Sequence, residues 1–323
     1  MSSSRKKIIL FNNNTFPPGF VSKIKRNFKN FNFIILKDHE FKKLNNQLES
    51  SNALINCPRK YFNEKLVKRF TNMDWVHTSA AGVDAFINPL FSNLEVCFTN
   101  GKILQGPEVA DHAIGIILSF SRNIHHYYKN PNIKNIKRPI ELFKKKALIV
   151  GFGGIGRCIS ERLTGFGMVI DVIAEELPAL TNEVNSFFSI QRLNKISKNY
   201  DVIISAAPLT LKTKKIFDYE FFKSMKKNSI FVNISRGKLV DTKALQKKNI
   251  HKKFLGLGLD VTYPEPLPKN HFLRKLPNVI LTNHSAGLSD NNRLRAYELM
   301  YENLSRYYNN QTLLNRVDKI EGY

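Results

Sequence analysis

Residues 147–156 read ALIVGFGGIG, an apolar run that leads into Gly151, Gly153, Gly154 and Gly156. The apolar run has the length of a buried strand, and Ile159 and Leu163 after it have helical spacing. Glycines at such a turn let the backbone bend sharply and approach a pyrophosphate, which the N–H groups at the start of the following helix attract. Because a further strand over 168–173 follows, the stretch predicts a dinucleotide-binding unit. A glycine-rich structural turn is the alternative.

Short strand patterns surround this stretch in two series, and each series alternates with helical segments. The series that contains the glycine turn has candidate strands at 147–150, 168–173, 187–190, 201–205, 230–234, 255–261 and 279–282. An earlier series has candidates at 7–11, 31–36, 53–56, 75–78 and 96–99, with amphipathic helical segments at 21–30 and 60–71 between them. Alternation at this spacing predicts two α/β bodies with parallel sheets.

The segment between the two series is a long apolar helix followed by a polar arm. Gly106 and Pro107 open a helix over 108–121 that is apolar on nearly every face, so we expect it to be buried. Residues 123–146 are polar, aromatic and basic, which is typical of an arm. A terminal helix past Ser289 has apolar residues at helical spacing and is expected to pack back on the first body. The predicted domains are 1–103 with 289–323, and 104–288.

Length and composition exclude several classes of protein. A chain of 323 residues with 42% apolar and 24% charged residues is typical of two globular domains. The apolar stretches fall far short of the roughly 20 residues of a membrane span, and the N-terminus lacks a secretory signal. Cys57, Cys97 and Cys158 are widely spaced, which argues against a disulfide framework or a metal site. We therefore expect a soluble cytoplasmic protein.

The balance of charge is unusual, with 50 Lys and Arg against 26 Asp and Glu and a formal net charge of +24. Such an excess raises nucleic acids, anionic membranes and small anionic substrates as partners. Basic clusters lie at 42–43, 144–146, 226–227, 247–248 and 252–253, on many different elements. Since a nucleic-acid site normally gathers such residues on one helix or stripe, we predict a solvated surface that attracts small anions, with no nucleic-acid or membrane partner.

Chemically active side chains follow three of the late strands. Arg236 follows the strand at 230–234, Glu265 follows 255–261, and His284 follows 279–282. Ligands of open parallel sheets bind beyond the carboxyl ends of the strands, so these side chains are expected to converge. A guanidinium can grip a carboxylate or carbonyl, and an imidazole oriented by a carboxylate can pass a proton. The set suits reduction of a 2-keto acid.

Each of these three residues also has a purely structural interpretation. Arg236 can be a capping or ion-pair residue, Glu265 a solvated loop residue, and His284 a hydrogen-bonding residue at a strand end. Their joint placement after neighbouring strands favours the catalytic interpretation over these alternatives.

The end of the second strand of the glycine-containing series bears on the choice of coenzyme. An acidic residue there accepts the ribose 2′-OH of NAD, whereas a basic residue favours NADP. The sequence reads Ile173, Ala174, Glu175, Glu176, so the acidic position falls at or beside Ala174. Glu175 can take this role, and the turn contains no Arg or Lys. The sequence favours NAD and leaves NADP open.

Several long motifs of the chain resemble the D-isomer-specific 2-hydroxyacid dehydrogenase family. In the second body they are GFGGIG (151–156), APLTLKTKKIF (207–217), FFKSMKKNSIFVNISRGKLVDTKAL (221–245), GLGLDVTYPEPLP (256–268) and LPNVILTNHSAG (276–287). In the first part they are SAAGVD (79–84) and GPEVADHAIGIILSFSRN (106–123). The resemblance implies two doubly wound lobes, a flavodoxin-like substrate domain and a Rossmann-type NAD(P)-binding domain, with the active site between them.

The resemblance also implies roles for individual residues. Arg236, Glu265 and His284 are the implied catalytic residues, with His284 as the acid/base, and Arg236 with the backbone of Ala81 and Gly82 binds the substrate carboxylate. The implied coenzyme-binding residues are Gly151, Gly153, Gly154, Ile155, Gly156, Glu175, Ala207, Pro208, Ile234, Ser235, Asp260 and Gly287. A homodimer through 106–146 is implied as well.

The activity implied by the resemblance is hydride transfer between NAD(P)H and a small 2-keto acid such as glyoxylate or hydroxypyruvate. A phosphoglycerate dehydrogenase-like enzyme and a non-catalytic NAD-sensing interaction protein are the alternatives. The sequence departs from the family pattern at Ala174, at Asn283, where proline is common, and at Lys144, where glycine is usual. None of these departures removes a catalytic group.

Overall fold

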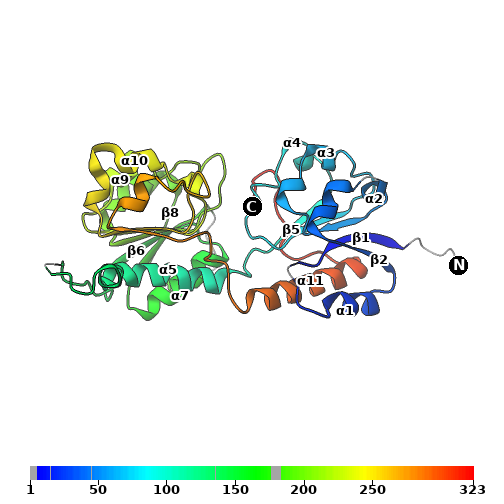
Figure 1. The fold of residues 1–323 in the computed structure, drawn as a ribbon, viewed down its shortest axis with the longest axis horizontal. Coiled ribbons are helices and arrows are strands. Elements are labelled where there is room, and N and C mark those ends of the chain that lie inside the picture. The colour runs from blue at the N-terminus through cyan, green and yellow to red at the C-terminus, as the bar shows by residue number, and fades with distance from the viewer. Residues whose placement is uncertain (1–5, 15, 45, 135, 176–182) are drawn as a thin grey trace. The chain divides into compact units, whose positions relative to one another are not determined.

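The computed structural model describes residues 6–14, 16–44, 46–134, 136–175 and 183–323. The chain divides into two compact units, the first formed by Met1–Leu104 with Ser289–Tyr323 and the second by Gln105–Leu288. Each unit is a parallel sheet with helices on its two faces (Figure 1). The prediction of α/β bodies with parallel sheets is confirmed.

The sheet of the first unit has the strand order β2-β1-β3-β4-β5, and every neighbouring pair is parallel. This is the flavodoxin-like order. The strands are β1 (Lys7–Asn12), β2 (Phe31–Leu36), β3 (Ala53–Ile55), β4 (Trp75–Thr78) and β5 (Cys97–Asn100). The α-helices are α1 (Phe20–Asn27), α2 (Asn46–Glu49), α3 (Glu64–Val67), α4 (Pro89–Ser92) and α11 (Asn292–Tyr308). Helices α1 and α11 cover one face (Figure 1), where Met300 and Leu304 pack with Ile9 and Trp75.

The sheet of the second unit has seven parallel strands in the order β12-β11-β10-β9-β6-β7-β8. The order reverses between β6 and β9, which is the position where doubly wound sheets bind their ligands. The strands are β6 (Lys146–Val150), β7 (Val169–Ile173), β8 (Ser186–Phe188), β9 (Val202–Ser205), β10 (Ile230–Asn233), β11 (Gly256–Leu259) and β12 (Val279–Leu281). The α-helices are α5 (Gly106–Ser121), α6 (Ile124–Lys129), α7 (Gly154–Gly165), α8 (Leu193–Ile196), α9 (Tyr219–Ser224) and α10 (Thr242–Gln246).

Short 3₁₀ helices complete both units. They are η1 (Asp38–Lys43), η2 (Arg59–Tyr61), η3 (Ile190–Arg192), η4 (Ser197–Asn199), η5 (Gly237–Leu239), η6 (Lys247–Lys253) and η7 (Phe272–Lys275). In the part of the chain that the structure describes, no helix has both the length and the apolar character that crossing a membrane requires.

The apolar helix α5 is buried within the second unit, against α7 and the sheet. A Cβ atom on Gly256 would lie 2.2 Å from the ring of Phe120, and one on Gly258 would lie 2.3 Å from Ile116 Cγ2. The glycines of β11 therefore let α5 approach the sheet closely. This contact explains why the strand sequence GLGL alternates small and large residues.

One sequence expectation is wrong in extent. Besides the end of η2, the segment 60–71 forms only the four-residue α-helix α3, which starts late because the side chain of Asn63 accepts a hydrogen bond from Leu66 N (3.1 Å). Phe62 and Phe70 on either side of it pack against each other and against Phe91. The hydrophobic period thus reflects aromatic packing around a short turn rather than one continuous helix.

Candidate active site

The glycine turn after β6 forms a cradle in which added side chains would collide with backbone. Gly151 has φ +98°, and a Cβ there would lie 2.5 Å from Ala207 N, while a Cβ on Gly156 would lie 2.4 Å from Gly151 O. Gly153 instead faces open space, and α7 starts beside it at Gly154 with no side-chain cap. Ile155 is half-buried against the core beneath. An uncapped helix N-terminus that an anion can approach fits the pyrophosphate of a dinucleotide.

The end of β7 holds an ion pair that the sequence did not predict. Ala174 is half-buried, and the exposed Glu175 lies beside Lys212, with 3.9 Å between Glu175 Oε1 and Lys212 Nζ. Lys212 comes from the loop after β9. A basic group therefore lies next to the turn after β7, although that turn contains no basic residue of its own. Glu176 lies outside the described residues. The loop that carries Lys212 also contains the buried Ala207 and the exposed Pro208.

The turn that carries Arg236 is held by a buried amide. Asn233, the fully buried last residue of β10, accepts hydrogen bonds from Ser235 N (3.2 Å) and Ser235 Oγ (2.9 Å), and its Nδ2 donates to Arg236 O (2.9 Å). Ser205 Oγ lies 2.8 Å from Ser235 Oγ. The Arg236 guanidinium is fixed by donation from Nη1 to Ser235 O (2.7 Å). Ile234 and Ser235 are buried, so the turn presents Arg236 rather than its neighbours.

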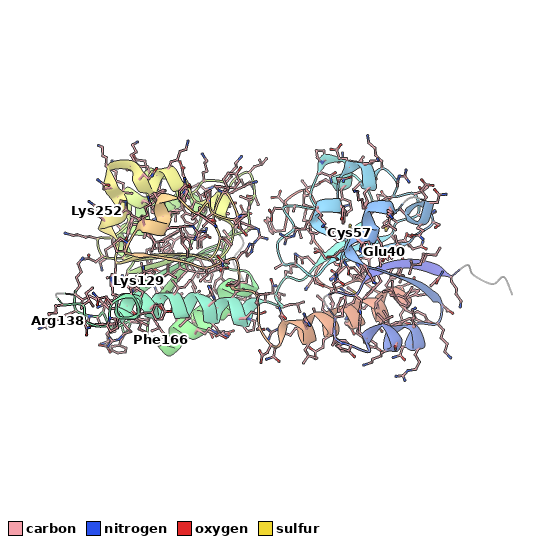
Figure 2. The ribbon with its side chains drawn as sticks, viewed as in Figure 1. Glu40, Cys57, Lys129, Arg138, Phe166 and Lys252 are labelled. Atoms are coloured by element: carbon pink, nitrogen blue, oxygen red, sulfur yellow. The ribbon has the colours of Figure 1, made fainter. Side chains whose placement is uncertain are left out.

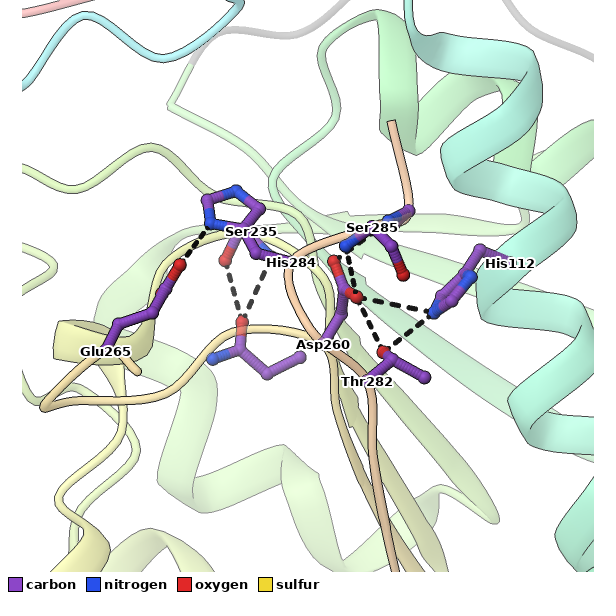
Figure 3. Close-up of polar contacts among 9 residues, drawn as sticks. His112, Ser235, Asp260, Glu265, Thr282, His284 and Ser285 are labelled. Atoms are coloured by element: carbon purple, nitrogen blue, oxygen red, sulfur yellow. Dashed lines mark hydrogen bonds and ion pairs between the residues drawn. The ribbon is translucent and has the colours of Figure 1, made fainter. Parts of the chain in front are cut away.

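Asp260 organises the loop that carries His284. Its buried carboxylate accepts hydrogen bonds from Thr282 Oγ1 (2.6 Å), Ser285 N (3.0 Å) and Ala286 N (3.2 Å) (Figure 3). His112, on α5, reaches the same group, with Nε2 3.5 Å from Asp260 Oδ1 and 2.9 Å from Thr282 Oγ1. These contacts make Asp260 an anchor of the site loop, in addition to the coenzyme contact that the resemblance implies.

His284 and Glu265 are in direct contact, as the sequence predicted. The distance between His284 Nδ1 and Glu265 Oε1 is 2.6 Å (Figure 3). A carboxylate only accepts hydrogen bonds, so Nδ1 carries the proton and Nε2 is the nitrogen left to act on a ligand. His284 also has φ 52°, a left-handed conformation held by donation from its N–H to Asp260 O (2.8 Å). Strained backbone of this kind concentrates at functional sites.

Glycines allow the segments of this site to approach each other. A Cβ on Gly237, next to Arg236, would lie 2.0 Å from Thr262 O, in the loop that leads to Glu265. A Cβ on Gly287 would lie 2.9 Å from Gln105 Nε2. The arginine turn and the glutamate loop are therefore in backbone contact within the second unit.

The predicted substrate loop lies in the first unit, at the carboxyl edge of its sheet. Asn100 Nδ2 donates to Ala81 O (2.7 Å), and Gly101 N donates to Ala80 O (3.0 Å), so carbonyl groups anchor the loop that continues into Gly82. A cavity of about 260 Å³ adjoins it, and both polar and apolar side chains line it. Its lining includes Asn12, Asn56, Thr78 and Ser79.

Sequence reasoning missed three groups that support the site, Asn233, Thr282 and His112. A signal for Asn233 was present, since a single amide ends the otherwise apolar run IFVN of β10. His112 had no comparable signal, because its hydrogen-bond partner Thr282 lies 170 residues away along the chain.

The family model described as D-isomer specific 2-hydroxyacid dehydrogenase, NAD binding domain, matches residues 114–286. The match takes in more than half of the chain. This chain belongs to the D-isomer specific 2-hydroxyacid dehydrogenase family. The second unit of this 2-hydroxyacid dehydrogenase contains the family's NAD-binding domain, and the prediction of an NAD(P)-dependent oxidoreductase is confirmed.

Relatives and solved structures agree with this membership. A glyoxylate reductase of Pyrococcus furiosus is 30% identical over 288 residues, which cover 85% of this dehydrogenase and 85% of that protein. A family member from Xanthobacter autotrophicus Py2, solved with NADPH and MES, has a TM-score of 0.82 at 21% identity and covers 99% of this chain and 100% of that one. D-Lactate dehydrogenase from Aquifex aeolicus, complexed with NAD and lactic acid, has a TM-score of 0.76 at 22% identity, covering 96% and 99%. The two structures establish the fold.

Proposed function

We propose that this dehydrogenase reduces a small 2-keto acid, such as glyoxylate or hydroxypyruvate, to the D-2-hydroxy acid, with NADH as the preferred coenzyme. The contact between His284 Nδ1 and Glu265 Oε1 at 2.6 Å carries this proposal. It leaves Nε2 of an accessible, oriented imidazole at the carboxyl edge of an NAD-binding sheet, where a proton donor for a substrate carbonyl is needed.

The proposed roles of the residues follow from their hydrogen-bonding capacity. The nicotinamide, when bound, supplies the hydride that reaches the carbonyl carbon. Arg236 grips the carboxylate and polarises the carbonyl, since a guanidinium presents a planar fork of donors. His284 delivers a proton from Nε2 to the carbonyl oxygen, which becomes the hydroxyl, while Glu265 holds the ring through Nδ1. Addition of the hydride to the carbonyl carbon and of the proton to the carbonyl oxygen converts the keto group into the alcohol.

We assign the first unit as the substrate domain, and its loop and cavity support a proposal for the size and polarity of the substrate. The backbone N–H groups of Ala81 and Gly82 are proposed to bind the substrate carboxylate. The adjoining cavity of about 260 Å³ is small and offers Asn56, Thr78 and Ser79 as hydrogen-bonding groups, which supports a short substituent at C3 that carries a hydroxyl. Hydroxypyruvate satisfies both conditions.

The coenzyme preference is proposed from the end of β7. Glu175 is exposed and can accept a hydrogen bond from the ribose 2′-OH of NADH. Lys212 beside it supports weaker use of NADPH, because an ammonium group attracts a 2′-phosphate. The remaining proposed cradle residues are Gly151, Gly153, Gly154, Ile155, Gly156, Ala207, Pro208, Ile234, Ser235, Asp260 and Gly287.

Assembly and location are part of the same proposal. We propose a cytoplasmic homodimer formed through α5 and the arm, residues 106–146. Exposed aromatic side chains on the arm support it, since Tyr128 is 90% exposed and Phe143 is 55% exposed. Large exposed apolar side chains of this kind are typical of surfaces that bind a partner.

The experiment that tests the proposal is a panel of 2-keto acids incubated with the purified protein and NADH or NADPH. We expect the highest kcat/KM with hydroxypyruvate or glyoxylate and NADH. Preference for 3-phosphohydroxypyruvate would support the phosphoglycerate dehydrogenase-like alternative. NADH binding without oxidation of any substrate would support a non-catalytic NAD-sensing protein and overturn the enzyme assignment of the site.

A further inference from the structure

Lysines that are far apart in the sequence lie together at the amino edge of the second unit's sheet. The strands β6, β9, β10, β11 and β12 are parallel neighbours, so the segments that lead into them meet at one edge. Each of these segments carries at least one exposed lysine. Six of these exposed lysines are called the amino-edge lysines below: Lys146, Lys198, Lys226, Lys227, Lys252 and Lys275.

Hydrogen bonds join the arm and the segments that lead into β6, β10 and β11 to one another. Asp201 accepts from Lys146 N (3.0 Å) and from Lys226 Nζ (2.6 Å), which ties the edge of β6 to the turn before β10. In that turn, Asn228 N donates to Lys253 O (2.9 Å) and Asn228 Oδ1 accepts from Lys137 Nζ (3.0 Å). The arm, β10 and β11 thus bring their cationic residues to one end of the second unit, where Figure 2 labels Lys252 and Arg138.

Carboxylates on this edge offset little of the charge. Asp201 is half-buried, and both of its oxygens are occupied by Lys146 N and Lys226 Nζ. Glu220 lies beside Lys223, with 3.4 Å between Oε2 and Nζ. Lys198, Lys227 and Lys252 extend into solvent beyond these pairs. The basic clusters at 144–146, 226–227 and 252–253 belong to different elements, as expected, but the parallel topology brings these three to one edge of the sheet.

We propose that the amino-edge lysines form a binding surface for the phosphate backbone of a nucleic acid. From β12 to β6 the row crosses four inter-strand spacings, about 20 Å in all, which is long enough to span several phosphates. Lysine ammonium groups act as point charges toward phosphates and do not read bases bidentately, so binding is independent of sequence. The proposal does not rest on the proposed dehydrogenase activity, whose residues follow the opposite ends of the same strands.

The observations favour a nucleic acid over an anionic membrane. A surface that inserts into a lipid interface exposes large apolar side chains among its cations. In the turns 197–201, 226–229, 251–255 and 275–278, all of them within the described ranges, no large hydrophobic side chain is exposed, and the segment before β6 exposes one, Phe143. The edge therefore offers many cations with a single exposed ring among them, which matches a hydrated polyphosphate chain better than a lipid interface.

The test measures binding of a short fluorescently labelled single-stranded RNA by anisotropy between about 50 and 200 mM salt. Two variants of equal charge are compared with the wild type. The edge variant is Lys198→Gln/Lys227→Gln/Lys252→Gln, and the control is Lys25→Gln/Lys29→Gln/Lys68→Gln on the first unit. We expect the edge variant to bind at least about 10-fold more weakly and to reduce the slope of log K against log salt by about 2. The control should change affinity less than about 2-fold.

Two outcomes would overturn the proposal. One is equal weakening by both variants, which assigns binding to net charge alone. The other is absence of RNA binding across this salt range, including a case in which vesicles of anionic phospholipid are bound instead. NADH oxidation by the edge variant, measured in parallel, is expected to equal the wild type and confirms that the variant is folded.

Discussion

The two sheets each hold a histidine at or near the carboxyl end of a strand, and the two histidines are built in opposite ways. His77 lies within β4, is 2% exposed, and its Nδ1 lies 2.8 Å from Thr99 Oγ1, which also accepts from Trp75 Nε1 at 2.8 Å. His284 lies beyond β12, is accessible, and contacts the carboxylate of Glu265. Burial lowers the pKa of His77 to about 3.

The difference separates a structural histidine from a candidate catalytic one. A buried imidazole with a hydroxyl partner stays neutral and adds one hydrogen bond to the sheet. An accessible imidazole that donates to a carboxylate keeps one nitrogen available for a substrate and can carry charge while doing so. Residue type is the same in both sheets, so the surroundings decide the role.

The largest expected effect comes from removing the accessible histidine. His284→Gln should lower kcat with a 2-keto acid by about 10² to 10⁴-fold, because the amide cannot donate a proton to the carbonyl oxygen. Stopped-flow or steady-state NADH oxidation measures the loss, and NADH fluorescence titration should give unchanged coenzyme affinity. His39→Gln, at an exposed histidine of the first unit, is the matched control and should keep full turnover. Full turnover by His284→Gln would show that another group donates the proton.

A smaller loss is expected when the carboxylate partner is neutralised. Glu265→Gln should reduce kcat on the order of 10²-fold, since an amide no longer requires the proton to sit on His284 Nδ1. Glu265→Asp keeps the charge and should recover part of the activity in the same assay. Equal activity of the glutamine variant and the wild type would contradict the assigned role of Glu265.

For the buried His77 we predict that pH affects the stability of the fold and not the turnover. Unfolded His77 takes up a proton below pH 6.5, whereas folded His77 does so only near pH 3. Between these values the unfolded chain binds more protons, so the free energy of unfolding decreases as pH falls, by up to about 1.4 kcal/mol per pH unit. Trp75 is the single tryptophan, and its fluorescence follows denaturant unfolding of the first unit.

The matched variant for this measurement is His77→Leu. Whatever its own stability, it should show a shallower dependence on pH than the wild type between about pH 6.5 and 4. Identical slopes in the two proteins would mean that His77 is protonated in the folded state.

The smallest expected effect concerns the coenzyme end of the second sheet. Lys212→Ala should raise the ratio of kcat/KM for NADH over NADPH by about 3- to 10-fold, because one exposed cation near a phosphate contributes on the order of 1 kcal/mol. Parallel assays with the two coenzymes measure the ratio. Lys214→Ala serves as the neighbouring control, and an equal shift in both variants would remove the specific role of Lys212.

Strand positions and the glycine turn could be predicted because they depend on local pattern. Runs such as 230–234 are apolar and β-rich whatever surrounds them, and Gly151 is required by the turn itself. His112, Lys212 and the amino-edge lysines could not be assigned, because the groups that they meet come from segments far away in the chain. The short helix α3 was misjudged since aromatic packing and helical periodicity place apolar residues at similar spacings.

The sequence by itself determined the two βα series, the phosphate cradle, the family and the three candidate catalytic residues after neighbouring strands. Only the tertiary structure decided which nitrogen of His284 is available, which groups hold Arg236 and Asp260 in place, and which lysines form one surface. The physical reason is that backbone conformation and burial follow from residues near in the chain. Hydrogen-bond direction and charge density depend on distances between atoms that the parallel sheet brings together from segments far apart.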